Sequence, residues 1–559
     1  MLAIEVPTKM AKGTTITVSS CLGICAIAFL SFLHGGDAFH PPFHGPSTLT
    51  RCNVASTSPP LFSNESRAAS SATSSNESGA ASSASSSGAL QTILGGGEQD
   101  TQAFFDDVWQ RIPRVYRNRN DAPSVVDGSE TNNPYSRQVD MGLQGIVKAL
   151  ENACQTFLEP LTAESQNSLP IVSRNRQCLS LQELAPLYGN DLFAAYLDGC
   201  SIIMNHVDRL CPNTASLCED LQKTFPFAYA NAYLTPPASQ AVAAHADDRD
   251  VFVIQVYGQK AWRVYEEIPI HYPYPHEQVG KNGMPVPQSV LDGPCSVDTV
   301  LRQGDVLYIP RGHVHQATTH TQGDDEAIQP SFHITIALAT FDWALSGLMA
   351  TAVKKTLDEI PEYRAAIPLA VGMHDNAQEI PVEQRRQLER HVDAALEIVR
   401  KELTTEAIND YLRQKYQWHT SKSAPQRMQR VAQATSMDQR SEESTASNSI
   451  IGPEAMKHIN MASWVRPSTP DEQALLSNIR QKRAPAMREE TSGVLSEILG
   501  TMRNEPSPVQ ISQILKLVKS GSGSGSSGES VGKYVCDLTL LSFIRSCVER
   551  GELSVVAAD

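Results

Sequence analysis

Residues 241–265 read AVAAHADDRDVFVIQVYGQKAWRVY, and residues 304–317 read GDVLYIPRGHVHQA. His245 and Asp247 are one residue apart on a β-patterned stretch, so we expect both side chains on one side of a sheet. The second stretch has a Gly-Asp turn, an apolar run and a Pro-Arg-Gly break, and it supplies His315 from another strand. Two histidines and one carboxylate are the ligand set of open-faced non-haem Fe(II) sites, which keep three octahedral positions free.

The runs around these residues predict an all-antiparallel strand region. After the metal pair, VFVIQVYG forms one strand, Gly258 marks a turn and AWRVY returns as a second strand, so the pair opens a hairpin. SFHITIALAT, residues 331–340, is a further strand-like run. Repeated short strands with turn signals indicate a β-sandwich or small barrel whose mouth can hold a ligand.

These motifs, with FFDDVWQRIP at 104–113 and NAYLTPPASQ at 231–240, resemble the JmjC-type ribosomal oxygenases, also described as bifunctional lysine demethylases and histidyl-hydroxylases. The resemblance implies an α+β fold: a JmjC or cupin-type double-stranded β-helix barrel with N-terminal helices, a helical dimerisation region and a C-terminal winged-helix-like domain. It also implies that His245, Asp247 and His315 bind Fe(II), with 2-oxoglutarate as co-substrate and O2 as oxidant.

The same resemblance implies the residues of a co-substrate pocket. Lys260 would pair with the distal carboxylate of 2-oxoglutarate, and the Tyr233 hydroxyl would add a hydrogen bond. Asn231 would line the pocket, and Thr335 matches a polar strand position nearby. A lysine suits this place because an unpaired carboxylate in a dry pocket is costly. The residues alone also allow Lys260 as a solvated turn lysine and Tyr233 as a core aromatic.

Other histidines compete for the third metal position. His313 would share a strand face with His315. The Pro-Arg-Gly-x-x-His pattern of the resembled family selects His315, which leaves His313 in the pocket wall or supporting a ligand. We expect His320 and His333 to be structural histidines.

The composition predicts a protein of several domains that has reduced thiols and does not bind nucleic acid directly. The chain has 559 residues, 41% of them hydrophobic, which is enough for several domains. Its eleven cysteines show no C-x-x-C pairing and no zinc-ribbon spacing, so we expect reduced, mostly buried thiols. The net charge of -15 disfavours sequence-independent binding to nucleic acid, and we expect no direct nucleic-acid partner.

The N-terminus has the order of a targeting leader. Lys9 and Lys12 precede CLGICAIAFLSFLHGG, whose apolar core of about 13 residues suits a signal peptide and is short for a membrane span. A stretch rich in Ser and Ala follows to about residue 97. This order resembles the signal-plus-transit leader of algae with secondary plastids, so we expect a plastid location and no membrane segment in the mature form. The alternative is a disordered extension on a nuclear or nucleolar protein.

Beyond the strand region the apolar spacing becomes helical. Leu388, Val392, Ala395 and Ile398 form one stripe, and the resembled family has a helical dimerisation module here, which implies a homodimer. Residues 420–450 have the composition of a linker. Three helical patterns after about residue 470, followed by ELSVVA, fit a winged-helix unit. Its middle helix offers few basic residues, which favours protein contact or stability over DNA reading.

The expected organisation has five parts. They are a signal-peptide-like segment (1–38), a Ser-rich transit or disordered segment (39–100), a JmjC catalytic domain (101–345), a helical dimerisation region with a linker (346–470) and a winged-helix-like domain (471–559).

The resulting hypothesis is an Fe(II)- and 2-oxoglutarate-dependent oxygenase that hydroxylates a protein side chain. The resemblance implies a histidine of a ribosomal protein as the target. One alternative is a histone lysine demethylase that uses the same iron site. A second alternative is a non-catalytic protein-binding scaffold, but a scaffold would be expected to have lost a ligand, and His245, Asp247, His315 and Lys260 are all present.

Overall fold

A computed structural model describes most of the chain outside the leader. The described residues are 88–96, 98–117, 142–156, 169–174, 176–188, 191–281, 283–319, 330–338, 343–365, 379–418, 421, 432, 449–450, 459–476, 489–504, 507–519 and 535–556. The signal-like segment, His320, most of the 420–450 linker and the GSGSGSSGES stretch lie outside them. In the described part of the chain, no helix is both long and apolar enough to cross a bilayer.

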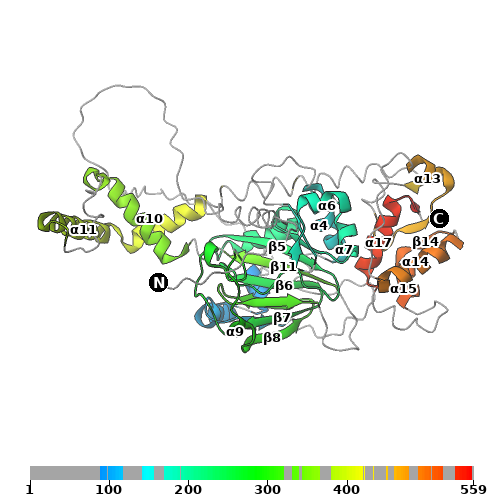
Figure 1. The fold of residues 1–559 in the computed structure, drawn as a ribbon, viewed down its shortest axis with the longest axis horizontal. Coiled ribbons are helices and arrows are strands. Elements are labelled where there is room, and N and C mark those ends of the chain that lie inside the picture. The colour runs from blue at the N-terminus through cyan, green and yellow to red at the C-terminus, as the bar shows by residue number, and fades with distance from the viewer. Residues whose placement is uncertain are drawn as a thin grey trace, which may run out of the picture.

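Two antiparallel sheets form the centre of the molecule (Figure 1). The large sheet has the strand order β1-β9-β6-β11-β5-β4-β2-β3, and the small sheet has the order β10-β7-β8. The predicted strands VFVIQVYG and AWRVY are found as β6 and β7, but the prediction that they form a hairpin is wrong, because β6 lies in the large sheet and β7 in the small one. The strands are β1 (Arg114–Tyr116), β2 (Ile171–Arg174), β3 (Gln177–Cys178), β4 (Ser201–Met204), β5 (Ala228–Thr235), β6 (Val251–Gly258), β7 (Lys260–Tyr265), β8 (Cys295–Leu301), β9 (Val306–Ile309), β10 (His315–Thr318) and β11 (Ser331–Leu338).

The strands of the large sheet are apolar on both faces because both faces are covered. In β6, Val251 and Val253 pack toward the small sheet in a cluster with Trp262. Phe252 and Ile254 point the other way, into the main core beneath the helices. A strand buried on both faces has a continuous apolar run instead of a polar–apolar alternation, which explains the sequence VFVI.

Helices cover the outer face of the large sheet. Phe104 is fully buried there, with its ring centroid 5.6 Å from Phe252 and 5.1 Å from Tyr308. Helix α2 begins inside the segment expected to be transit peptide or disordered, and its Leu90 and Ile93 are buried in the same core. The elements are α2 (Ala89–Leu94), α3 (Glu98–Ala103), the π-helix η1 (Phe104–Val108), α4 (Leu143–Thr156), α6 (Leu181–Leu187), α7 (Leu192–Leu197), η2 (Val207–Arg209) and α8 (Pro212–Leu221).

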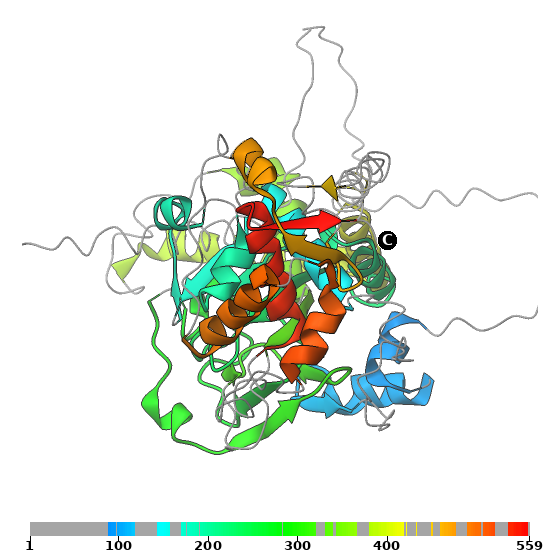
Figure 2. The same cartoon turned by 90° about the vertical axis from the view of Figure 1, so that its right-hand side faces the viewer.

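The C-terminal unit packs against these helices and faces the viewer in Figure 2. The three predicted helices and the final strand are confirmed, and the unit's sheet has the order β12-β15-β13-β14. Arg545 on α17 reaches Glu151 on α4 at 2.7 Å, and Tyr257 on β6 donates to Asp537. The elements are β12 (Ser449–Ile450), β13 (Trp464–Pro467), α13 (Pro470–Leu476), α14 (Glu489–Asn504), β14 (Val509–Gln510), α15 (Ile511–Lys519), α17 (Asp537–Glu549) and β15 (Leu553–Val556).

On the opposite side of the barrel, a helical region extends away from the sheets (Figure 1). It contains α10 (Leu345–Asp358), the 3₁₀ turn η5 (Pro361–Arg364) and α11 (Val382–Glu402), and residues 405–418 are also helical. The helices predicted for this region are therefore confirmed. All eight cysteines within the described ranges are free thiols, and four of them are buried.

Replacing Gly258 with Ala tests the β6–β7 turn. Gly258 has φ +63°, and a Cβ there would lie 1.9 Å from the Pro330 carbonyl oxygen. We expect Gly258→Ala to lower the free energy of unfolding by about 2–4 kcal/mol, because neither backbone can yield easily. The matched control is Gly347→Ala in α10, where a Cβ meets nothing within 4 Å. That change is expected to stabilise by about 0.5–1 kcal/mol. Urea unfolding measures the free energy of unfolding of both variants. Equal values for Gly258→Ala and Gly347→Ala would contradict the steric requirement for glycine at position 258.

Candidate metal centre and co-substrate pocket

His245 and His315 are joined through their backbones. His245 N donates to His315 O at 3.1 Å and His315 N donates to His245 O at 2.9 Å, which forms an isolated antiparallel bridge. His315 is the first residue of β10, so the third ligand comes from another strand as predicted. This pair of hydrogen bonds places the two imidazole rings side by side, with centroids 4.5 Å apart.

The prediction that His245 and Asp247 share a strand is wrong. Strand β6 starts at Val251, and the metal pair lies in the irregular segment ahead of it. Successive backbone groups of this segment bond to different partners: Ala246 N donates to Val279 O, and Gly312 N donates to Asp247 O. A segment held by two loops in this way cannot continue a regular ladder.

The three side chains still converge on one point. His245 Nε2 lies 3.7 Å from Asp247 Oδ1, and His315 Nε2 lies 3.6 Å from Asp247 Oδ2. One ligand atom from each residue falls within 4.8 Å of the others. The donors fit a divalent transition metal of intermediate softness, which binds imidazole nitrogen and carboxylate oxygen.

The backbone fixes which nitrogen of each histidine faces the metal position. His245 Nδ1 lies 2.8 Å from Ala243 O, and His315 Nδ1 lies 3.0 Å from His313 O. A carbonyl accepts a hydrogen bond from a protonated Nδ1, so Nε2 keeps its lone pair for a metal. Both rings are therefore held in the tautomer and the orientation that a ligand needs.

Electrostatics keep the donors in their metal-binding protonation states. Burial, assisted by the nearby Lys281 ammonium, lowers the pKa of His245 to about 3. Burial also lowers the pKa of His315. Burial alone would raise the pKa of Asp247, but Lys281 and the two histidines bring it below its ordinary value. The site is thus two neutral imidazoles and one ionised carboxylate at neutral pH.

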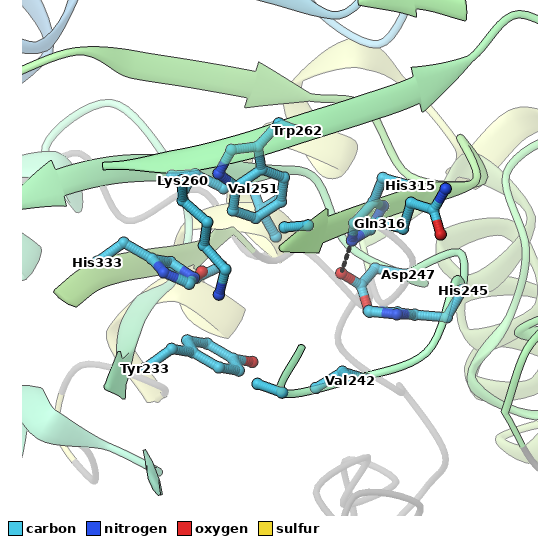
Figure 3. Close-up of a pocket in the computed structure, with 14 residues that line it drawn as sticks. Tyr233, Val242, His245, Asp247, Val251, Lys260, Trp262, His315, Gln316 and His333 are labelled. Atoms are coloured by element: carbon cyan, nitrogen blue, oxygen red, sulfur yellow. Dashed lines mark ion pairs between the residues drawn. The ribbon is translucent and has the colours of Figure 1, made fainter. Parts of the chain in front are cut away.

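The cavity beside the ligands holds the predicted co-substrate residues. Figure 3 shows Lys260, Tyr233 and His333 at one end and His245, Asp247 and His315 at the other. The lining side chains come from both sheets and from the segment before β6: Tyr233, Ala241, Val242, His245, Asp247, Val251, Val253, Lys260, Trp262, His315, Gln316, Ala317, His333 and Thr335.

Lys260 is a buried cation rather than a solvated turn residue. Its residue exposure is only 3%, and its Nζ donates to Thr235 Oγ1 at 2.9 Å. Burial lowers the pKa of Lys260 to about 7. Within the described ranges no carboxylate forms an ion pair with Lys260. A lysine kept in a dry pocket in this way indicates a site for an anion that arrives from solution.

The other predicted pocket residues divide into two groups. Tyr233 and Thr335 line the cavity, and the Tyr233 ring stacks on His333 with centroids 4.8 Å apart. Asn231 is not among the lining side chains of the described chain. The prediction that it lines the pocket is therefore wrong. Its Oδ1 accepts from His206 N at 3.0 Å and its side chain bonds Tyr233, so Asn231 holds a lining residue in place.

The rival histidines are placed away from the metal position. His313 lies in the turn before β10, not on a strand with His315, and only its carbonyl takes part in orienting a ligand. His333 sits at the co-substrate end of the cavity and is almost fully buried. The assignment of His315 as the third donor is thus supported by geometry as well as by the motif.

Two residues of the site were not anticipated from the sequence. Trp262 forms one wall of the cavity, and Lys281 forms an ion pair with Asp247. Trp262 lies two residues after Lys260 on the same strand face, so the strand period was a usable signal for it. Lys281 lies 34 residues from Asp247 in a loop, and no local pattern links the two.

The fold and the donor set define a cupin-type double-stranded β-barrel with a His₂-carboxylate centre. Residues 204–340 match the model of the JmjC domain, so the chain carries a JmjC domain. Through this region it is related to proteins named bifunctional lysine-specific demethylase and histidyl-hydroxylase NO66. The Drosophila mojavensis protein is 32% identical over 254 residues, covering 41% of this chain and 27% of that protein. The Drosophila melanogaster protein is 38% identical over 179 residues, covering 31% and 26%.

The chain thus spans about a quarter of the length of the curated relatives it matches. Solved structures of Escherichia coli YcfD are also similar. One is 13% identical with a TM-score of 0.32, and a second, described as a ribosomal oxygenase in complex with cobalt and 2-oxoglutarate, is 12% identical with a TM-score of 0.30. Each comparison covers 81% of this chain and 97% of the other.

Exchanging the two candidate histidines for Ala tests the ligand assignment. Loss of a residue that only hydrogen-bonds to a metal ligand typically weakens metal binding roughly 10–100-fold. We expect His315→Ala to weaken Mn(II) binding by more than this, because a donor atom is lost. His313→Ala keeps the carbonyl that orients His315, so its affinity should stay within about threefold of the natural protein. Free Mn(II) is counted by electron paramagnetic resonance. A larger loss in His313→Ala than in His315→Ala would reverse the assignment.

Proposed function

We propose that the protein is an Fe(II)- and 2-oxoglutarate-dependent oxygenase that hydroxylates a protein side chain, with a histidine of a ribosomal protein as the target. The observation that carries the proposal is one cavity with a His₂-carboxylate donor set at one end and the buried Lys260 ammonium at the other. A keto acid with a distal carboxylate fits both ends at once. The names of the related Drosophila proteins include a histidyl-hydroxylase activity, which supports the choice of a histidine as the target.

The residues present fit an iron ion and its co-substrate. His245, Asp247 and His315 would hold the metal on one face, which leaves positions for a keto acid and for oxygen. Bound iron supplies the oxidative decarboxylation of 2-oxoglutarate to succinate, coupled to insertion of oxygen into a C–H bond. Lys260 and Tyr233 would bind the distal carboxylate and orient the keto acid toward the metal.

The apolar wall of the cavity has a separate task. Val251, Val253 and Trp262 belong to a buried cluster between the two sheets. They exclude water around the distal carboxylate position, and a charge-assisted hydrogen bond from Lys260 is stronger in such a low-dielectric setting. Binding of the dianion would also offset the cost of burying the ammonium.

We further propose that the leader delivers the protein to a plastid, which makes plastid ribosomal proteins the first substrates to test. The assay incubates the purified protein with Fe(II), 2-oxoglutarate and oxygen, with and without ribosomal proteins of the same organism. We expect substrate-dependent succinate formation and a peptide heavier by one oxygen atom on a histidine. Lys260→Met should raise the KM for 2-oxoglutarate about 10–100-fold, because a charged partner is lost.

Two controls sharpen this assay. His245→Ala should abolish turnover, and turnover that survives it would contradict the proposal. Lysine demethylation is the second candidate, since the names of the relatives include it and the same iron chemistry removes a methyl group as formaldehyde. Formaldehyde from methylated histone peptides, with no oxygen added to any ribosomal protein, would favour the demethylase.

We also propose that the α10–α11 region mediates a homodimer. Four large apolar side chains there are exposed in the single chain: Leu345 (69%), Val382 (51%), Val392 (47%) and Leu396 (61%). Val392 belongs to the predicted apolar stripe of α11, and that stripe is only partly covered by the rest of the chain. The buried contacts of α17 support a stabilising role for the C-terminal unit rather than a nucleic-acid partner.

Placing a charge on α11 tests the dimer. Leu396→Glu should weaken self-association at least tenfold, because a carboxylate would be buried at the apolar contact. Leu517→Glu on α15 is the matched control, since Leu517 is 56% exposed outside this region. Light scattering coupled to gel filtration measures the mass of each variant. A monomeric natural protein, or an unchanged Leu396→Glu dimer, would exclude this interface.

A further inference from the structure

A short loop segment packs directly on the residues that carry the metal ligands. We name residues 278–281, in the connection from β7 to β8, the strap. Ala246 N donates to Val279 O at 2.9 Å, between the two ligands of the metal pair. A Cβ on Gly280, which has φ +80°, would lie 2.3 Å from Ala244 O. The strap therefore contacts the ligand segment backbone to backbone, and only glycine permits so close an approach.

The strap ends in a cation that touches a metal ligand. Lys281 Nζ donates to Asp247 Oδ1 and lies 3.2 Å from Gln278 Oε1. Gln278 is in turn held by its Nε2 bond to Pro275 O at 2.9 Å. The Lys281 side chain is only 17% exposed. The ammonium is thus held in place from two sides, unlike that of a solvated surface lysine.

The Lys281 ammonium contacts Asp247 without lining the cavity itself. Asp247 lines the cavity, whereas Lys281 is not among the lining side chains of the described residues. Oδ1, the oxygen that Lys281 engages, lies 3.7 Å from His245 Nε2, and Oδ2 lies 3.6 Å from His315 Nε2. One oxygen of Asp247 is therefore occupied by the protein itself.

We infer that Lys281 is a positioning residue that makes Asp247 bind the metal through one oxygen only. This inference rests on the proposed function. A carboxylate that chelated through both oxygens would take one of the three positions needed by the keto acid and oxygen. By holding Oδ1, Lys281 keeps that position open for the co-substrate.

The arrangement has a cost in metal affinity that makes it testable. An ammonium one hydrogen bond away from a ligand repels a divalent cation, and it also competes for the carboxylate. Removing the charge while keeping the side-chain length should therefore tighten metal binding and weaken co-substrate binding. A residue that merely stabilised the loop would weaken both.

The experiment measures Mn(II) binding, and then 2-oxoglutarate binding to the Mn(II)-loaded protein, for Lys281→Met and Lys281→Arg. We expect Lys281→Met to bind Mn(II) about tenfold more tightly and 2-oxoglutarate about tenfold more weakly. Lys281→Arg keeps a cationic donor and should stay within about threefold on both measures. Lys354→Met is the matched control, because Lys354 forms an exposed ion pair with Asp358 on α10.

A spectroscopic readout accompanies the affinities. The visible absorption of the Co(II)-loaded protein should change in Lys281→Met, because the coordination of Asp247 changes, and should be retained in Lys281→Arg. Thermal unfolding identifies folded variants, and Lys281→Gln replaces the Met variant if the latter does not fold. Unchanged or weaker Mn(II) binding in Lys281→Met would overturn the inference, as would an Arg variant that behaves like the Met variant. A natural protein that binds no Mn(II) would instead overturn the proposed function.

Discussion

The site depends on one pair of backbone hydrogen bonds, those between His245 and His315. The segment before β6 has no regular ladder of its own, and this bridge fastens it to the first residue of β10. Because backbone groups make the connection, the side chains stay free to present Nε2 to a metal. Carbonyl acceptors at Nδ1 then complete the orientation of both rings. The metal position therefore lies where the segment before β6 is bridged to strand β10.

A second constraint is the dry interior between the sheets. The large sheet is covered by helices on one face and by the small sheet on the other, so its strands are largely apolar. Between the sheets lies the cavity in which Lys260, Tyr233, His333 and Thr335 face the candidate metal ligands. Burying an uncompensated ammonium costs free energy, and an anionic co-substrate is the partner that would offset this cost. Burial of Lys260 therefore lowers the stability of the folded chain but provides a binding site for the co-substrate.

Much of this arrangement could be predicted from local patterns. Strands β6, β7 and β11, the C-terminal helices and the three candidate ligands all follow from alternation, turn residues and one motif with its spacing. Three expectations needed the folded chain. Strands β6 and β7 do not pair as a hairpin, because the chain passes from the large sheet to the small one at Gly258. His245 and Asp247 do not lie on a strand, because loops on either side capture their backbone groups. Asn231 does not line the cavity, and its Oδ1 accepts from the His206 backbone.

The sequence by itself determined which atoms are available for chemistry: two imidazoles, one carboxylate and a lysine in motifs of short, fixed spacing. These features are local, so they can be read from neighbouring residues. The tertiary structure alone decided that Lys281 lies against Asp247, since they are 34 positions apart with β6 and β7 between them, and no periodicity records such a contact. The close backbone approach between Gly280 and the segment that carries His245 is likewise visible only in the folded chain. Contacts between distant segments arise from packing of the whole chain, and a linear pattern does not contain them.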